Sequence, residues 1–249
     1  DSIMELLICI DALRRASAKS ITAVLPYFAY ARQDRKVSPR SPISAKLFAN
    51  LLMVSGTSRV LTMDLHANQI QGFFDIPVDN LFAAPIFVQH IKKNIKSKNL
   101  VCVAPDVGGV ERARAIAKRL SADLAIIDKR RSGPGTSEVM NVIGDVRNKI
   151  CVIIDDLVDS GGTIVNAAAA LKSKGAKDVY AYVVHGVLTG EAVKKINTSK
   201  IKKFIISNSI MNTKKIKKSA KFQTISVGTL FAEAIKRISI SKSVSKLFK

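Results

Sequence analysis

The chain has 249 residues, of which 47% are hydrophobic and 24% are charged, which is enough for one large or two modest domains. No apolar run approaches the ~20 residues that span a bilayer, and no secretory signal is visible, so we expect a cytoplasmic protein without a membrane partner. The net charge of +21 favours polyanionic partners in general, but the few aromatic residues do not interleave with the lysines, so we do not expect nucleic acid to bind.

Apolar residues at helical spacing alternate with short apolar runs from the start of the chain. The pattern predicts a helix at residues 3–13, a strand at 21–25, a helix at 44–55 and a strand at 59–63. Gly56 is the expected stop of the second helix. A longer, largely helical stretch is predicted at residues 81–96.

The same alternation continues in the second half of the chain. Strands are predicted at residues 100–104, 124–127, 150–154 and 179–184, and helices at residues 110–120 and 164–174. The strands are almost continuously apolar, which is typical of buried parallel strands with helices on both faces of the sheet. The sequence therefore predicts an α/β protein.

The length and the alternation favour two tandem domains. We expect the first at residues 1–83 and the second at residues 84–228. The chain opens with Asp1 directly on a helix, whereas an α/β unit normally begins with the strand before its first helix. We therefore expect the first domain to be N-terminally shortened, without its opening strands, and to be completed by a C-terminal helix within residues 229–249.

Three cysteines, Cys9, Cys102 and Cys151, are widely spaced, and each lies in an apolar stretch. We expect them to be buried free thiols. No Cys/His spacing indicates a zinc site.

The most informative segment is Asp155-Asp156-Leu157-Val158-Asp159-Ser160-Gly161-Gly162-Thr163, which follows an apolar strand and precedes a helix. Small residues let backbone N–H groups close around an anion, and a helix N-terminus favours phosphate. Asp155 and Asp156 would repel phosphate and suit the vicinal hydroxyls of a ribose, or a metal. The segment therefore predicts a site for a ribose 5-phosphate group, although an acidic strand end with an ordinary helix start is the alternative.

Ligands bind beyond the carboxyl ends of parallel strands. Three further predicted strand ends are followed by polar residues that could contact a ligand. Arg32 and Gln33 follow the first strand, His66 follows the second, and Lys129 and Arg131 follow the strand at residues 124–127. Each is ambiguous alone, since basic turns and lone histidines are common. No P-loop and no dinucleotide-binding glycine motif occurs in the chain.

The segment at 155–163 resembles the phosphoribosyl-diphosphate motif of type I phosphoribosyltransferases. The wider chain resembles one branch of that superfamily, the ribose-phosphate diphosphokinases. The stretches that carry this resemblance are residues 26–36 (PYFAYARQDRK), 64–74 (DLHANQIQGFF), 105–109 (PDVGG) and 128–131 (DKRR).

The resemblance implies two tandem phosphoribosyltransferase-like domains and a pyrophosphate transfer from Mg-ATP to ribose 5-phosphate. It implies ATP contacts by Arg32 and Gln33, a Mg²⁺ site marked by His66 and Asp106, and a catalytic loop with Lys129 and Arg131. It places ribose 5-phosphate on Asp155, Asp156, Asp159, Ser160, Gly161, Gly162 and Thr163. It also implies a homo-oligomer, a hexamer.

Two other functions stay open. A phosphoribosyltransferase that consumes phosphoribosyl diphosphate would share the 155–163 loop but would not need Arg32 and Gln33. A regulatory relative would bind sugar phosphates without catalysis, and the presence of Lys129 and Arg131 argues against it.

Overall fold

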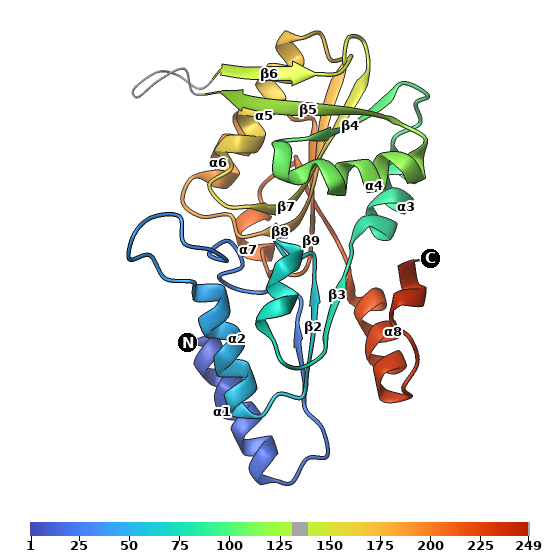
Figure 1. Cartoon of the computed structure of the whole chain (residues 1–249). Helices are drawn as coiled ribbons and strands as arrows, with labels where there is room; N and C mark the ends of the chain where they lie inside the picture. The colour runs from blue at the N-terminus through green and yellow to red at the C-terminus, as the bar shows by residue number, and fades with distance from the viewer. Residues whose placement is uncertain (131–138, 249) are drawn as a thin grey trace. The chain divides into compact units, whose positions relative to one another are not determined.

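The computed structural model describes residues 1–130 and 139–248. The chain folds into two compact units, residues 1–82 and 83–249 (Figure 1). Helix α8 (Gly228–Ser239) groups with the second unit. Completion of the first domain by this helix has no support in these contacts and stays a prediction. None of the helices in the described residues combines the length and the apolar character that a bilayer crossing requires.

The first unit is a small parallel sheet covered by two helices. Its strands lie in the order β1 (Thr22–Leu25), β2 (Arg59–Met63), β3 (Val78–Leu81). Its helices are α1 (Ser2–Arg15), α2 (Ser44–Ser55) and the short 3₁₀ helix η1 (Asn68–Phe73). At the centre of the core the rings of Phe28 and Phe48 lie 5.0 Å apart, and the ring of Phe74 lies edge-on to Phe28. As predicted, α2 stops at Gly56, which has a positive φ of 118°.

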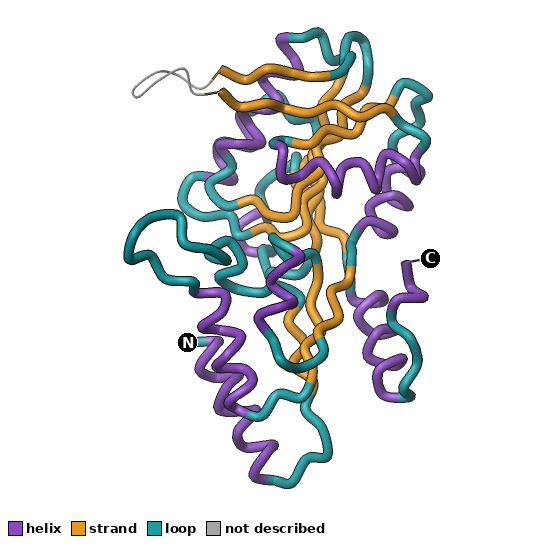
Figure 2. Tube along the Cα trace, viewed as in Figure 1, coloured by secondary structure: helices purple, strands orange, loops and turns teal. Residues whose placement is uncertain are grey.

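The second unit is built on a seven-stranded sheet in the order β10-β9-β8-β7-β4-β5-β6, parallel except for the β5–β6 pair. The strands of both units are orange in Figure 2. Its strands are β4 (Leu100–Ala104), β5 (Asp123–Arg130), β6 (Val139–Ile143), β7 (Ile150–Val158), β8 (Asp178–Gly186), β9 (Lys203–Ser207) and β10 (Phe222–Ile225). Its other helices are α3 (Ala84–Asn94), η2 (Val107–Gly109), α4 (Val110–Leu120), α5 (Gly162–Ser173), α6 (Ala192–Thr198), α7 (Thr213–Ile216) and η3 (Ser245–Phe248).

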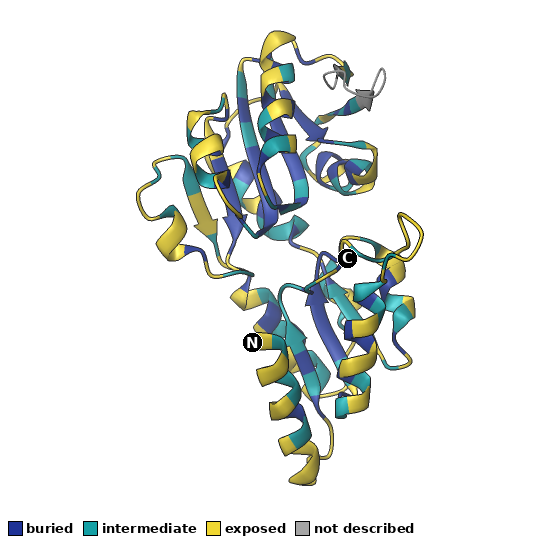
Figure 3. Ribbon diagram, turned by 90° about the vertical axis from the view of Figure 1, so that its left-hand side faces the viewer, coloured by how far each residue is buried: buried dark blue, intermediate teal, exposed yellow. Residues whose placement is uncertain are grey.

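Helices cover both faces of this sheet, as expected for apolar parallel strands. Alternate residues of the central strands pack with α5 and α6 in one buried cluster. On the other face, Phe87 of α3 meets Tyr182 of β8 edge-on, with ring centroids 5.4 Å apart. Every residue of β4 is buried, and the central strands form the dark core in Figure 3. The α/β class and the mostly parallel sheets flanked by helices are thus confirmed.

Several predicted element bounds were wrong. Strands β3, β6, β9 and β10 were not predicted. The helix predicted at residues 81–96 is shorter in the structure, where α3 begins at Ala84. β3 contains Asp79 and Asn80, and aspartate and asparagine are uncommon in strands. Their side chains have tertiary partners instead: Asp79 accepts from Arg59 Nη1 at 2.6 Å, and Asn80 Oδ1 accepts from the Leu65 N–H at 3.2 Å.

Three predicted strands are longer in the structure, because each keeps a pairing partner. β8 runs from Asp178 to Gly186 through its pairing with β7. β5 continues to Arg130 through its antiparallel pairing with β6. β7 continues to Val158 through its pairing with β8. Asp155 and Asp156 therefore lie inside β7 and not after it.

Candidate active site

The carboxyl end of β7 lies at the point where the strand order of the second unit changes direction. β5 lies on one side of β4, and β7 and β8 lie on the other. The last paired residues of β4 and β7 are Val103 and Ile153, after which the chain from β4 turns into η2. In open parallel sheets, such a switch point between neighbouring strands is where ligands bind.

Two carboxylates and one guanidinium meet at this switch point. Arg112 Nη1 from α4 lies 3.2 Å from Asp156 Oδ1 and 3.9 Å from Asp155 Oδ1. The Asp155 and Asp156 side chains are only 14% and 7% exposed, and that of Arg112 is 19% exposed. Burial raises the pKa of Asp155 well above its ordinary value, the Asp156 charge raises it further, and Arg112 opposes both effects.

Arg112 was not singled out from the sequence. Its helix was predicted and its abundance of arginine was visible, but nothing local linked it to acids 43 and 44 positions later. One feature of the sequence could have pointed to Arg112: it lies in the first turn of the predicted helix that follows Asp106, at the same edge of the sheet as the acid pair.

The segment between β7 and α5 has the geometry of an anion-binding loop. Gly161 precedes the first residue of α5 and has a positive φ of 79°, which favours glycine. The N-cap residue, Gly161, has no side chain with which to cap this helix, and the first turn of the helix contains no acid. A helix start of this kind presents N–H groups and a partial positive charge to an anion.

Asp106 lies in the loop directly after β4, on the same edge of the sheet as Asp155. Its Oδ1 accepts a hydrogen bond from the Gly109 N–H at 3.0 Å, which closes the tight turn of η2. The charge of Asp106 contributes to the raised pKa of Asp155, as expected for neighbouring carboxylates.

The predicted catalytic loop is described only at its start. Lys129 is the penultimate residue of β5 and stands opposite Met140 of β6. Arg131 lies outside the described residues. β5 directly neighbours β4, so Lys129 lies near the carboxyl edge that carries Asp106.

The predicted nucleotide contacts belong to the first unit and also follow strand ends. Arg32 and Gln33 lie in the loop after β1, and His66 lies three residues after β2; Arg32 and His66 are exposed. The two loops touch, because Gln69 Nε2 donates to Asp34 Oδ2 at 2.9 Å. Gln33 supports its own loop by donating from Nε2 to Pro42 O at 3.1 Å.

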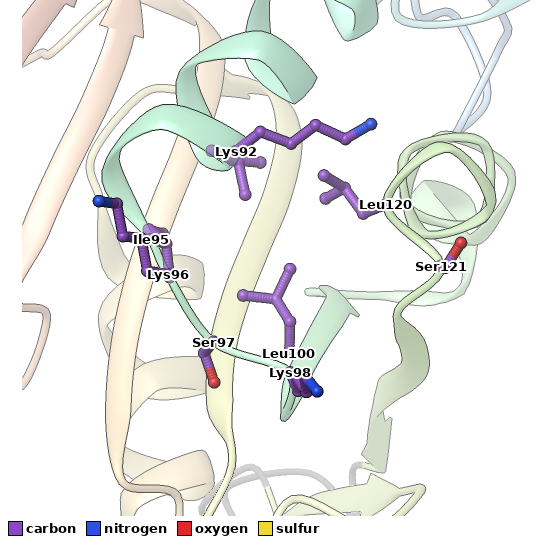
Figure 4. A pocket seen from close by; sticks show the side chains of 9 residues that line it. Lys92, Ile95, Lys96, Ser97, Lys98, Leu100, Leu120 and Ser121 are labelled. Carbon is purple, nitrogen blue, oxygen red and sulfur yellow. The ribbon is translucent and has the colours of Figure 1, made fainter.

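A cavity of about 640 Å³ lies at the opposite edge of the second unit's sheet, beside the first residue of β4 (Figure 4). Ile91, Ile95, Leu100 and Leu120 line it, together with three lysines, of which Lys92 extends toward Leu120. Helices α3 and α4 both end here, and cations in their last turns stabilise the partial negative charge of helix C-termini. Of the three lysines that line the cavity, Lys92 thus has a structural explanation that requires no ligand.

The chain is similar to known proteins over its whole length. It is 58% identical to the ribose-phosphate pyrophosphokinase of Bradyrhizobium diazoefficiens and 59% identical to that of Brucella melitensis. Each alignment covers 100% of this chain, and 78% and 80% of the respective relative. Residues 1–56 match the family described as the N-terminal domain of ribose phosphate pyrophosphokinase, and residues 132–249 match the phosphoribosyl synthetase-associated domain.

A solved structure supports the same relationship. The phosphoribosylpyrophosphate synthetase of Mycobacterium smegmatis superposes with a TM-score of 0.90 at 40% identity, over 96% of this chain and 78% of that protein. Sequence identity and fold agree along the chain. The chain belongs to the ribose-phosphate pyrophosphokinase (diphosphokinase) family.

Proposed function

We propose that this chain transfers pyrophosphate from ATP to the C1 hydroxyl of ribose 5-phosphate, giving phosphoribosyl diphosphate and AMP for nucleotide biosynthesis. The C1 oxygen forms a bond to the β-phosphorus, the bond between that phosphorus and the oxygen bridging to the α-phosphate breaks, and the hydroxyl proton is released. The observation that carries the proposal is the acid pair of β7 beside the amino end of α5, within a family of this named activity.

The loop 159–163 is proposed to hold the 5-phosphate. The N–H groups at the start of α5 and the hydroxyls of Ser160 and Thr163 are the donors. Asp155 and Asp156 accept from the ribose hydroxyls, which aims the C1 hydroxyl. This division of roles follows from charge, because carboxylates repel a phosphate and attract hydroxyl donors.

ATP is assigned to Arg32 and Gln33, and Mg²⁺ to His66 and Asp106. No group of three or more His, Cys, Asp or Glu side chains in the described residues forms a metal cluster. Mg²⁺ is usually bound by one or two carboxylates together with substrate phosphates, so the Asp106 carboxylate suits this ion. When bound, the ion neutralises triphosphate charge.

Lys129 and Arg131 are proposed to stabilise the charge that develops on the transferred group. Phosphoryl-type transfer depends mainly on positioning and electrostatic stabilisation, so cations at this point are required in the transition state more than in the substrate complex. We further expect a homo-oligomer and a cytoplasmic location, as in the sequence-based prediction.

Phosphorus NMR of the purified chain with ribose 5-phosphate, ATP and Mg²⁺ tests the reaction directly. The expected result is the appearance of AMP together with a phosphoribosyl-diphosphate signal. If a folded chain forms a nucleotide from phosphoribosyl diphosphate and a nucleobase, but forms no phosphoribosyl diphosphate from ATP and ribose 5-phosphate, the chain is a phosphoribosyltransferase. If the chain binds ribose 5-phosphate but catalyses neither of these two reactions, it is a non-catalytic binding protein.

Lys129→Ala tests the catalytic assignment. Loss of one preorganised donor typically lowers kcat about 100- to 1000-fold, and we expect both KM values to change little. Lys98→Ala, at the opposite edge of the sheet, is the matched control and should keep the parent kcat. A kcat for Lys129→Ala within a few-fold of the parent would remove Lys129 from the mechanism.

A further inference from the structure

The segment after β8 is hydrogen-bonded along the strand end that leads into the phosphate loop. Residues 187–190, named the strap here, follow Gly186. The N–H groups of Val187 and Leu188 both donate to Val158 O, at 3.0 and 3.2 Å. Thr189 then makes two bonds to Asp159: its N–H donates to the carbonyl at 3.1 Å, and its Oγ1 donates to the carboxylate Oδ1 at 2.6 Å.

The strap is itself held from its other side. Lys215 Nζ donates to the carbonyls of Val187 and Leu188, at 3.0 and 3.1 Å. Leu188 is 2% exposed, so its side chain anchors the strap in the core. Thr189 O accepts from the Ala192 N–H at 3.1 Å, which ties the strap to the start of α6. Thr189 is thus an exposed side chain on a backbone that is fixed on both sides.

The position of the Asp159 carboxylate matters for phosphate binding, and Thr189 fixes that position. Asp159 opens a loop proposed to bind a phosphate, and an ionised carboxylate beside that anion is repulsive unless its position is controlled. A hydroxyl donor at 2.6 Å engages one carboxylate oxygen in a charge-assisted hydrogen bond, which is shorter and stronger than a neutral one. The second bond, to the Asp159 carbonyl, controls the backbone of the same residue.

We propose that Thr189 is a positioning residue for ribose 5-phosphate: through its paired bonds to Asp159, it holds the loop 159–163 with its amides ready for the 5-phosphate. The inference rests on the proposed function, since it concerns the same site. Thr189 contacts no reacting group in this assignment and acts through Asp159. The loop gains affinity by being ordered before the substrate arrives.

The inference makes a selective kinetic prediction. Removing the hydroxyl takes away one hydrogen bond of the Asp159 carboxylate, while the backbone bond remains. A hydrogen bond to a charged group is worth about 10- to 100-fold in a conformational equilibrium constant, so its loss can lower the population of the binding-competent loop by up to that factor. We expect the KM for ribose 5-phosphate to rise by that factor, while the KM for ATP stays within about twofold of the parent.

The test uses Thr189→Val, which removes the hydroxyl at similar size, and Thr189→Ser, which keeps it. Thr198→Val is the matched control, because the Thr198 hydroxyl donates only to carbonyls of its own helix, those of Lys194 and Lys195. The 249-residue chain is titrated calorimetrically with ribose 5-phosphate in the absence of ATP, and the thermal midpoint and both KM values are measured for each variant.

The expected result is a Kd for ribose 5-phosphate about 10- to 100-fold higher in Thr189→Val, restored to near the parent value in Thr189→Ser and unchanged in Thr198→Val. A Thr189→Val Kd equal to that of the parent overturns the inference. So does a loss in which both KM values and the thermal midpoint change together, since that pattern reports general destabilisation.

Failure of the inference is distinct from failure of the proposed function. If the parent chain does not bind ribose 5-phosphate, the site assignment itself is wrong and Thr189 loses its role with it. If the parent binds and all variants bind equally, the site stands and only the positioning role is removed.

Discussion

Asp155 occupies a position in the second unit that opposes its ionised form. It is nearly buried, it adjoins Asp156, and Arg112 lies 3.9 Å away, so the guanidinium compensates the pair incompletely. A charged group kept in such a position for ligand recognition lowers the stability of the free protein. The carboxylate pair therefore connects the proposed ribose contact to a measurable pH dependence of folding.

Asp155→Asn should stabilise the fold at neutral pH while abolishing turnover. The folded-state pKa of Asp155 is raised above its ordinary value of 3.8. Below that value both folded and unfolded states hold the proton, and Asp155 contributes no pH dependence. As pH rises from 3.8 toward the folded-state pKa, only the unfolded state releases the proton, so the free energy of unfolding falls. The total fall is about 1.4 kcal/mol for each pH unit that separates the two pKa values, and it stays constant above the folded-state pKa.

Urea unfolding of Asp155→Asn and the parent at pH 4 and pH 8 checks this expectation. The gain in the variant should be near zero at pH 4 and largest at pH 8. Asp178→Asn, whose carboxylate pairs with Lys202 at the surface, is the control and should change stability by less than about 1 kcal/mol. A variant that is less stable than the parent at pH 8 contradicts the argument.

The three cysteines differ more than their sequence settings indicated. Cys102 and Cys151 are buried as predicted, and burial raises the pKa of each thiol to about 12. Cys9 is exposed, so the prediction of burial was wrong there. Ile10 is the buried residue of α1, and the adjacent Cys9 falls on the solvent side of the helix.

Thiol titration under native conditions should therefore detect one reactive cysteine per chain, and three after denaturation. Cys9→Ser should remove the native signal and leave two thiols on denaturation, because thiol reactivity requires both access and a reachable thiolate state. Rapid native reaction in Cys9→Ser would show that β4 or β7 opens readily, contrary to their burial.

At the scale of elements, the start of α5 depends on one backbone conformation. Gly161 has a positive φ, and a Cβ there would meet Ile196 and Ala192 only at ordinary contact distances of 3.5 to 3.6 Å. The requirement for glycine is thus conformational and not steric. Gly162, the next residue, has neither a positive φ nor an atom within 4 Å of an added Cβ.

Gly161→Ala should lower stability by about 1–2 kcal/mol, the cost of a side chain in the left-handed region. Gly162→Ala should be neutral or stabilising by up to about 1 kcal/mol, because alanine is the better helix residue. Differential scanning calorimetry of the two variants makes the comparison. Equal midpoints for the pair would mean that the loop adopts a different conformation in solution.

At the scale of the whole molecule, helices α1 and α2 of the first unit expose several large apolar side chains. Six large apolar side chains of these helices are between 41% and 78% exposed: Met4, Ile8, Leu13, Leu47, Leu51 and Val54. Isolated exposed apolar residues are normal, but such a number on two helices is typical of protein–protein contact. This observation supports the proposed homo-oligomer.

Light scattering after size exclusion should therefore give a mass that is a multiple of 27.0 kDa. The double variant Leu47→Glu/Val54→Glu should weaken self-association by about tenfold or more, because charge replaces apolar contact area. Asn50→Glu, an exposed polar position on the same helix, is the control. A parent chain of 27.0 kDa at micromolar concentration contradicts the proposed oligomer.

The local pattern of the chain determined much of this protein. The α/β class, the strands β1, β2, β4, β5, β7 and β8 and most helices follow from apolar periodicity, which is a property of neighbouring residues. The 155–163 segment was recognisable for the same reason, because a strand end, small residues and a helix start are consecutive in sequence. The family followed from motifs of this local kind.

Tertiary structure alone decided the features that join distant residues. β3 and the edge strands of the second unit have polar or mixed sequences and are defined by pairing partners, so periodicity did not reveal them. The contact of Arg112 with the acid pair spans 44 residues, and that of Thr189 with Asp159 spans 30. Such contacts follow from the order of strands in the sheet, which brings the carboxyl ends of β4, β7 and β8 to one edge, and no local pattern in the chain encodes that order.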